Sequence, residues 1–486
     1  MHADPTDVLI IGSGIAGLSA AVAAAEELGG TGSVTVLDRA ARGEAGGNTR
    51  WTAAYFRLDD VYEPGENFVD DVVGFSGGRT PRWYVDELVR RLPETMEWIQ
   101  DHGARFRRMP TYFINSTRPR LQPVGGGEGL LAALRPAAER LGVTFRYEAT
   151  VHGLVLNGDG AVAGVEVDGP DGTRTLAAST VVIASGGFEG DPDYLGEQLG
   201  ADAGTLLPIA PSVRLNRGEV IRAALAAGAG RAGQWDTFHA EPVDPRSPDA
   251  EALVMVFPYG ILVDRHGRRF LDEGRGTVDE IYEAVARAIW ARDGGTAWFL
   301  TDQRLHRVDE HERGLLTTVA PVRADTVGEL AAALDLPADA LADTVARYNA
   351  ATPDDADFDW RRPDGLGTQG LEPPKSNWAL PLDAPPFLAY PLACSIVFTF
   401  GGLATDVRAR VVRDDGTAIA GLYAAGECTG LYHGKYPGGT SVLRGMVFGR
   451  VAGTDAARVA TGTRVRPAHA GVDQRSIGPR EDTGGP

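Results

Sequence analysis

A glycine-rich turn close to the amino terminus constrains the fold of this chain more than any other feature. The apolar run 7–11 is typical of a buried strand in a parallel sheet, and the sequence Gly-Ser-Gly-Ile-Ala-Gly follows it at 12–17. An alanine-rich helix is expected up to about Leu28, and a second strand at 34–37. A strand, a G-x-G-x-x-G turn and a helix together predict a βαβ unit that binds a dinucleotide.

Each glycine of this turn has a separate task in such a unit. Gly12 allows the tight bend, Gly14 lets the backbone approach a pyrophosphate, and Gly17 lets the helix pack closely on the strand. The first N–H groups of the helix and its dipole attract the phosphates. Asp38 closes the second strand about 20 residues after Gly17, where a carboxylate accepts hydrogen bonds from the ribose hydroxyls. The alternative is a βαβ turn that binds no ligand.

A second glycine-rich region near the carboxyl terminus distinguishes a flavin from a nicotinamide. The run 421–427 predicts a strand that enters a glycine turn with Glu427 at its tip. It resembles the segment that flavoproteins use late in the chain to hold the ribityl group. Gly438 and Gly439 precede an expected helix at 442–452, whose amino terminus would favour the negative charge of a reduced flavin. A nicotinamide enzyme has no use for this distant region, so the two together predict FAD.

Composition limits what else the chain can be. Its 486 residues suggest two domains, and its net charge of −19 argues against a nucleic-acid partner. No apolar run approaches the roughly 20 residues of a membrane helix, and the first strand begins so early that we expect a cytoplasmic protein. Two cysteines, Cys394 and Cys428, cannot build an iron–sulfur cluster, so any further redox centre lies on a partner. No metal site is expected.

Changes in amino-acid composition along the chain predict a discontinuous domain. Tryptophan and proline become more frequent after about residue 232, and glycine-rich segments occur again from residue 401. Between them, helices are expected at 278–290 and 338–349. The expected fold class is α/β, with a mobile cap that closes over the flavin and excludes water. The expected parts are a Rossmann-like FAD-binding domain of the two-dinucleotide-binding type from 1–231 and 386–468, an inserted α+β capping domain at 232–385, and a disordered tail at 469–486.

The sequence resembles the FAD-binding family of fumarate reductase and succinate dehydrogenase flavoproteins over roughly residues 7–460. Within that family it is most similar to the tricarballylate dehydrogenase-like branch, and more remotely to 3-ketosteroid Δ1-dehydrogenases. The segments that carry the resemblance are 12–17, 46–49, 125–127, 184–188, 267–273 and 421–449.

The resemblance implies which residues hold the cofactor. The run 46–49 would lie beside the flavin dimethylbenzene ring and the diphosphate, and Val151 would present its backbone to the adenine. Family members with covalent flavin have a histidine just before the double glycine, where this chain has Glu44 and Ala45, so we expect non-covalent FAD. The expected cofactor contacts are Gly12, Gly14, Ile15, Ala16, Gly17, Asp38, Arg39, Gly46, Gly47, Asn48, Thr49, Val151, Ala184, Ser185, Gly186, Gly426, Glu427, Ser441, Val442 and Leu443.

Three positions depart from the pattern of the fumarate reductases. Those enzymes carry a proton-donating arginine four residues after the glutamate of their G-x-R-F-x-x-E segment, where this chain has Thr277. The carboxylate-binding histidine of their H-T-x-G-G segment is Phe398 here, and their late R-x-G-G arginine is Tyr436. The resemblance therefore implies that fumarate and succinate are poor substrates.

Tyr436 is the first catalytic candidate, because a tyrosine in the corresponding segment of ketosteroid dehydrogenases helps to polarise a ketone. The alternative is a tyrosine merely packed under the flavin edge. Arg275 is a candidate to bind a substrate carboxylate or transfer a proton, or else a solvated, salt-bridged arginine. His433 is a weaker catalytic candidate, since a lone histidine near a glycine-rich loop is more often structural. The candidates for substrate contacts are His239, Phe398, Thr399 and Arg120, the last of which could equally belong to a charged loop face with Arg118.

The expected reaction is α,β-dehydrogenation of a carbonyl or carboxylic acid compound, or the reverse reduction. A proton leaves the carbon next to the carbonyl while hydride passes from the neighbouring carbon to flavin N5. Tyr436 from the FAD-binding domain and Arg275 from the cap are expected to flank the small-molecule substrate. Electrons would then pass to an external acceptor, which could be a protein, a quinone or O₂. The alternatives are a flavin oxidase that uses O₂ and a flavin-dependent isomerase without net redox.

Overall fold

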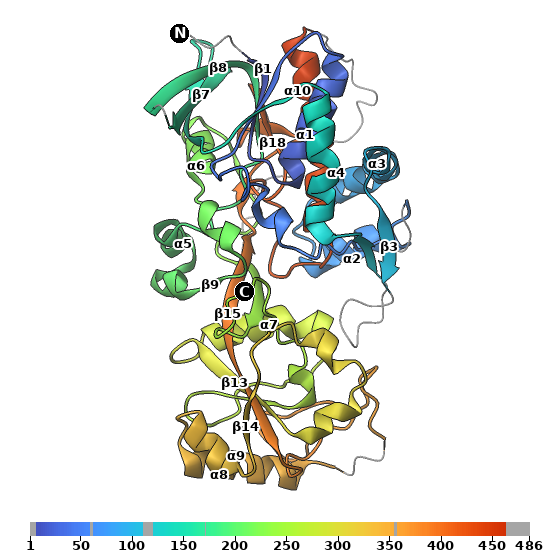
Figure 1. The fold of residues 1–486 in the computed structure, drawn as a ribbon, viewed down its shortest axis with the longest axis vertical. Helices are drawn as coiled ribbons and strands as arrows, with labels where there is room; N and C mark the ends of the chain where they lie inside the picture. Colours follow the sequence, from blue (N-terminus) through green and yellow to red (C-terminus); the bar gives the residue numbers. More distant parts are fainter. Residues whose placement is uncertain (1–5, 59–61, 110–119, 171, 354–356, 463–486) are drawn as a thin grey trace, which may run out of the picture.

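The computed structural model describes residues 6–58, 62–109, 120–170, 172–353 and 357–462. The expected disordered tail and Arg118 lie outside these residues. The chain forms two parts stacked along the long axis of the molecule (Figure 1). The upper part holds both chain regions that carry the glycine-rich motifs, and the lower part is built from the middle of the sequence.

The upper part is organised around a largely parallel sheet, which confirms the α/β prediction. Its strand order is β17-β18-β8-β1-β2-β5, in which only β17 runs antiparallel to its neighbour. β6 and β7 extend it as an antiparallel meander from β8. The strands are β1 (Thr6–Ile11), β2 (Val34–Leu37), β5 (Thr144–Arg146), β6 (Thr150–Leu156), β7 (Val162–Gly169), β8 (Gly172–Ile183), β17 (Arg410–Val412) and β18 (Ala418–Ala424).

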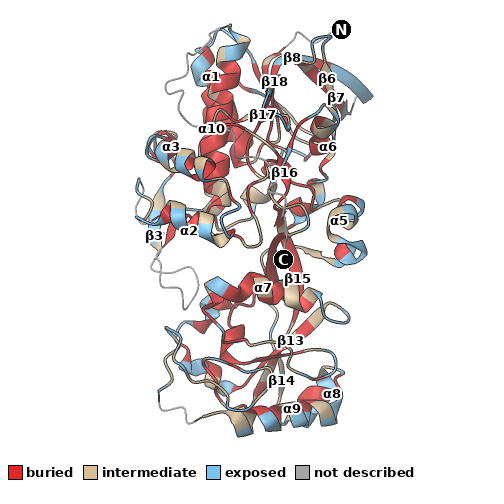
Figure 2. Ribbon diagram, turned by 180° about the vertical axis from the view of Figure 1, so that it is seen from behind, coloured by how far each residue is buried: buried red, intermediate tan, exposed pale blue. Residues whose placement is uncertain are grey.

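Two helices from opposite ends of the sequence, α1 (Ile15–Leu28) and α10 (Ser441–Ala460), pack closely against each other beside this sheet (Figure 2). Glycine makes the contact possible. A Cβ atom at Gly449 would lie 2.3 Å from the carbonyl oxygen of Ala16, and one at Gly453 would lie 2.1 Å from that of Ala20. The first and last helices are therefore locked together by backbone contact, which brings the amino terminus of α10 beside the glycine turn.

The remaining elements of the upper part surround this core. They are α2 (Phe68–Phe75), α3 (Arg82–Asp101), β3 (Phe106–Met109), β4 (Arg120–Pro123), α4 (Gly126–Arg140), α5 (Pro192–Leu199), α6 (Glu219–Ala226) and the short pair β10 (Arg231–Ala232) and β16 (Gly402–Leu403).

The lower part is a second, mixed sheet with helices around it. Its order is β11-β15-β13-β12, with β14 and β9 also paired to β15. α7 begins at a capping box, in which Thr277 and Glu280 satisfy each other's backbone N–H groups. The elements are β9 (Leu207–Pro208), β11 (Phe238–Val243), β12 (Ile261–Val263), α7 (Val278–Trp290), β13 (Thr296–Thr301), β14 (Val322–Ala324), α8 (Val327–Ala333), α9 (Ala338–Ala351) and β15 (Phe387–Thr399).

β15 connects the two parts. Its first half pairs with β13 over 388–393, and its second half pairs with β11 over 393–399. It therefore begins inside the lower sheet and ends in the upper part (Figure 1). The expected domain boundary between 385 and 386 falls just before this strand, so the lower sheet extends past that boundary.

Candidate active site

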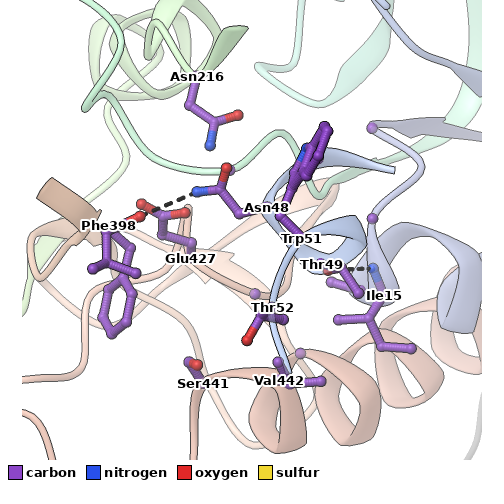
Figure 3. A pocket seen from close by; sticks show the side chains of 18 of the residues that line it. Ile15, Asn48, Thr49, Trp51, Thr52, Asn216, Phe398, Glu427, Ser441 and Val442 are labelled. Carbon is purple, nitrogen blue, oxygen red and sulfur yellow. Dashed lines mark hydrogen bonds between the residues drawn. The ribbon is translucent and has the colours of Figure 1, made fainter. Parts of the chain in front are cut away.

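One continuous cavity runs from the glycine turn of residues 12–17 to the side chains of β11 and α7. The upper part supplies the glycine turn, the segment 47–55 and the start of α10. The lower part supplies His239, Glu241 and Tyr282. Figure 3 shows part of this wall, where segments from three regions of the sequence meet. The cavity thus has a glycine-rich end and an end lined by side chains of the lower part.

The glycine turn forms a cradle of backbone. Gly12 has a φ of +102°, and a Cβ atom there would lie 2.3 Å from the carbonyl oxygen of Ala184. A Cβ atom at Gly17 would lie 1.9 Å from the carbonyl oxygen of Gly12. Gly14 differs, because a Cβ atom added there would lie no closer than 3.4 Å to any other atom, which is an ordinary van der Waals distance. Protein packing therefore demands glycine at 12 and 17, whereas at 14 the open space is left for a ligand.

The amino terminus of α1 and the end of β2 flank this cradle. The Ile15 N–H donates to the Thr49 hydroxyl at 3.1 Å (Figure 3), so the segment 46–49 is fixed against the helix start. The Asp38 carboxylate accepts from the Ser13 N–H at 3.0 Å and from the Ala40 N–H at 2.9 Å. Arg39 pairs with Glu219, and Val151 is 2% exposed at the same end of the cavity.

Two neighbouring carboxyl groups, Glu189 and Glu427, lie at the cavity wall: Glu427 lines the cavity, and the buried Glu189 is bonded to the lining residues Asn48 and Asn216. Asn48 and Asn216 donate to Glu189 Oε1 at 2.9 Å and 2.6 Å, and the Thr399 N–H donates to Glu427 Oε1 at 3.0 Å. Burial and the neighbouring Glu427 raise the pKa of Glu189 well above its usual range, and burial also raises the pKa of Glu427. The neutral form of Glu189 is therefore favoured more than in an exposed glutamate. Sequence reasoning missed it, although it directly follows the motif 184–188.

Tyr436 connects the amino terminus of α10 with the lower part. Its hydroxyl accepts from the Thr440 and Ser441 N–H groups, both at 2.9 Å, and donates to the Ser441 hydroxyl at 3.0 Å. Its ring lies 4.6 Å from the His239 ring and 5.0 Å, edge-to-face, from the Phe398 ring. The hydroxyl oxygen is thus placed where the helix favours negative charge.

His239 lies between two glutamates. Its Nδ1 atom is 3.4 Å from Glu283, and its Nε2 atom is 3.6 Å from Glu241. Burial lowers the pKa of His239, but the hydrogen bonds and charges of the two glutamates outweigh it and raise the pKa above its ordinary value. The imidazolium is therefore favoured. Arg287 and the Tyr436 N–H hold Glu283 in place at 3.0 Å and 3.1 Å.

Arg120, Asp279, Tyr282, Glu241 and Glu251 also line this end of the cavity, and sequence reasoning singled out only Arg120 among these five. Arg120 pairs with Asp279 at 3.2 Å and is 2% exposed. Burial raises the pKa of Tyr282, and burial together with Glu241 raises the pKa of Glu251 to about 8. Glu241 itself had a detectable signal, because it follows His239 by two positions on one strand and so shares its face. Glu251 has no such signal, because it belongs to none of the sequence motifs.

Some predicted residues do not reach the cavity wall. Arg275 is exposed, and neither it nor His433 is among the described residues that line the cavity. Burial and the nearby Arg79 lower the pKa of His433. Thr277 is occupied as the cap of α7. Arg275 therefore does not line this cavity with Tyr436, and four expected contacts, Gly17, Gly46, Thr399 and Leu443, are likewise not among the lining residues.

Membrane-spanning helices and clustered metal ligands are both absent from the described ranges. No helix in these ranges is long and apolar enough to cross a bilayer. Likewise, no group of three or more His, Cys, Asp or Glu side chains in these ranges could hold a metal ion.

The cavity fits FAD, since the space at Gly14, the start of α1 and the buried Glu427 offer sites for a pyrophosphate and a ribityl chain. The family model of the FAD binding domain matches residues 7–443. The chain therefore belongs to the FAD binding domain family, and FAD is its cofactor.

Known relatives agree in sequence and in fold. The 4-oxocyclohexanecarboxylate 2-dehydrogenase of Sinomonas cyclohexanicum is 32% identical over 398 residues, which cover 76% of this chain and 67% of that protein. The open conformation of a flavocytochrome c3 fumarate reductase superposes with a TM-score of 0.76 at 26% identity, covering 94% of this chain and 79% of that chain. A 3-ketosteroid-Δ4-(5α)-dehydrogenase from Rhodococcus jostii RHA1 superposes with a TM-score of 0.70 at 25% identity, covering 94% and 98%. The protein is an FAD-dependent oxidoreductase of the dehydrogenase and reductase class.

The mode of FAD attachment gives a first prediction. Glu44 and Ala45 precede the double glycine and offer no imidazole to the flavin. We expect acid or heat to release intact FAD into the supernatant, which chromatography of the supernatant would show. Yellow colour that stays with the polypeptide in denaturing electrophoresis would contradict this expectation.

Proposed function

We propose that the protein catalyses α,β-dehydrogenation of a ketone, or the reverse reduction of a conjugated ketone. The observation that carries this proposal is the Tyr436 hydroxyl, which lies on the amino terminus of α10 at the wall of the cavity. Two N–H groups donate to its oxygen and stabilise negative charge there, so the O–H, which donates to the Ser441 hydroxyl in this structure, becomes a strong donor when it turns to a substrate carbonyl. Such a hydrogen bond weakens the C–H bond next to the carbonyl.

The charges of the cavity favour a ketone over a dicarboxylate. Its substrate end carries the acids Glu241, Glu251 and Asp279, while Arg120 is already paired with Asp279 and His239 lies between glutamates. A dicarboxylate would therefore have no unpaired cation in this part of the described lining. Leaving two carboxylates without charge-assisted partners costs on the order of several kcal/mol.

The relatives support a ketone substrate through their names. Two of the three named above act on compounds with a ring ketone, an oxocyclohexanecarboxylate and a 3-ketosteroid. The aromatic wall of Phe398, Tyr436 and Tyr282 offers apolar surface to such a ring. Bound FAD would supply the hydride acceptor.

A substrate panel tests the proposal. Under anaerobic conditions, we expect 4-oxocyclohexanecarboxylate or a 3-ketosteroid to bleach the flavin stoichiometrically, and succinate to leave it oxidised. Pre-reduced enzyme should reoxidise slowly or not at all with fumarate. The measurement is the visible absorbance of the flavin in a stopped-flow instrument. Turnover of fumarate as fast as that of the best ketone would contradict the proposal, and conversion of a ketone without bleaching would instead indicate an isomerase.

We propose further that the electrons leave to an external acceptor, which is a protein, a quinone or O₂. Cys394 and Cys428 are both buried, and burial raises the pKa of each thiol to about 12, which makes them poor redox partners for a flavin. Reoxidation of the substrate-reduced flavin in air, compared with a quinone, separates an oxidase from a dehydrogenase.

A further inference from the structure

We propose that Glu251 is the general base that takes the proton from the carbon next to the substrate carbonyl. The inference rests on the proposed ketone dehydrogenation and assigns its proton-transfer residue. Neither the sequence motifs nor the proton-donor position of fumarate reductases, which is Thr277 here, points to this side chain.

The backbone holds Glu251 in a conformation that few glutamates adopt. Its φ is +55°, in the left-handed region. Its N–H donates to the Ile209 carbonyl at 3.0 Å, and its carbonyl accepts from the Leu253 N–H at 2.7 Å. Leu253 in turn bridges to Val243, at the end of β11. Strained residues that are fixed by their surroundings are concentrated at functional sites, and this one lines the cavity.

The carboxyl group of Glu251 lies in surroundings that suit a base. The backbone of Ala53 lies beside it, and Ala53 belongs to the segment that lines the cavity beyond Asn48 and Thr49. Its charged neighbour is Glu241 on β11. Tyr55 also lies near it: burial and the charge of Glu251 raise the pKa of Tyr55, against the opposing effect of Arg107 and Arg313.

No salt bridge to Glu251 occurs within the described part of the chain. Burial and the negative charge of Glu241 raise the pKa of Glu251 to about 8. Near neutral pH the group can therefore both accept and release a proton.

Other ionisable groups at this end of the cavity already have hydrogen-bond or ion-pair partners. Both ring nitrogens of His239 face carboxylates, and the Tyr436 hydroxyl is bonded to the start of α10. Asp279 is paired with Arg120, and Glu241 is beside His239. Of Glu241, Glu251 and Asp279, the three carboxyl groups at this end of the described cavity lining, only Glu251 has no cationic partner.

The step balances in atoms and electrons. The proton of the carbon next to the carbonyl passes to a Glu251 oxygen, and the electron pair of that C–H bond becomes the new C=C bond. The neighbouring carbon loses a hydride, so the substrate is oxidised by two electrons and the oxidised flavin is reduced by two. Glu251 then releases its proton to solvent before the next turnover.

The test compares Glu251→Gln and Glu251→Asp with wild type in anaerobic flavin reduction by 4-oxocyclohexanecarboxylate or a 3-ketosteroid. We expect Glu251→Gln to retain FAD but to lower the rate constant about 10²–10⁴-fold, and Glu251→Asp to recover part of the rate. In wild type the rate should rise with pH up to about 8, since the base must be ionised, and Glu251→Gln should lose this limb. Glu148→Gln is the matched control, because Glu148 also has a positive φ of +53° but is exposed and outside the cavity lining.

A second readout does not depend on turnover. Infrared difference spectra of the FAD-bound protein between about pH 6 and about pH 10 should contain a carboxylic acid band that disappears in Glu251→Gln and persists in Glu148→Gln. Ketone-driven reduction of Glu251→Gln at the wild-type rate, or the absence of this band from wild type, overturns the assignment of Glu251 and leaves the proposed function standing. If wild-type flavin is reduced by no ketone, the proposed function itself fails, and the base role fails with it.

Discussion

Replacement of Tyr436 by phenylalanine is expected to slow flavin reduction by the ketone substrate about 10²–10⁴-fold, the range for losing a positioned electrophile. The ring can stay in its contacts with His239 and Phe398, so the fold and bound FAD should persist. What disappears is the O–H that the Thr440 and Ser441 N–H groups activate. Stopped-flow absorbance gives the rate constant, and FAD content per protein confirms that the cofactor remains.

Tyr432→Phe is the matched control for this substitution. Tyr432 lies on the same loop, is buried, and donates or accepts a hydrogen bond with the Thr440 hydroxyl, but it does not line the cavity. Its loss should change thermal stability more than the rate. Equal rate constants for Tyr436→Phe and wild type would show that Tyr436 only packs against its neighbours.

Substitution by valine should have different effects at two glycines of the same turn. Gly14→Val should weaken FAD binding about 100-fold or more, because the side chain takes the space of the pyrophosphate, while the protein still folds. The backbone at Gly14 is extended, with φ −69° and ψ −175°, so valine causes no strain there. Gly17→Val should destabilise the fold itself by about 3 kcal/mol or more, because a Cβ atom there overlaps the Gly12 carbonyl oxygen.

Flavin content and thermal unfolding by circular dichroism separate the two effects. The expected Gly14→Val protein is colourless but unfolds cooperatively, whereas Gly17→Val is recovered in low yield with or without added FAD. A Gly14→Val protein that purifies with stoichiometric FAD would contradict the assignment of this turn to the pyrophosphate.

The cofactor half of the site could be predicted from sequence because its chemistry is local. A dinucleotide turn needs glycine at fixed positions, and each backbone clash at Gly12 and Gly17 is decided by residues of the same supersecondary unit. The strands at 7–11 and 34–37 and the helix at 278–290 were predicted for the same reason. Local patterns specify local structure.

The substrate half could not be predicted because it is assembled from distant segments. Glu251, Glu241 and Asp279 meet the aromatic wall only once the lower part is docked on the upper part, and no short motif records that docking. Arg275 was selected by its spacing from a family position, yet the capping box that starts α7 at Thr277 leaves it on the exposed side. The spacing of a residue from a motif does not determine the direction in which its side chain points.

β15 has a mechanical consequence for the enzyme. Its first half pairs with β13 and its second half with β11 of the lower sheet, and at its far end the Thr399 N–H is also bonded to Glu427 and the Phe398 ring contacts Tyr436. The strand therefore links the lower sheet directly to Glu427 and Tyr436 at the cavity, so a rotation of the lower part would displace these contacts. The colour and fluorescence of the flavin should then register the position of the lower part even in the absence of substrate.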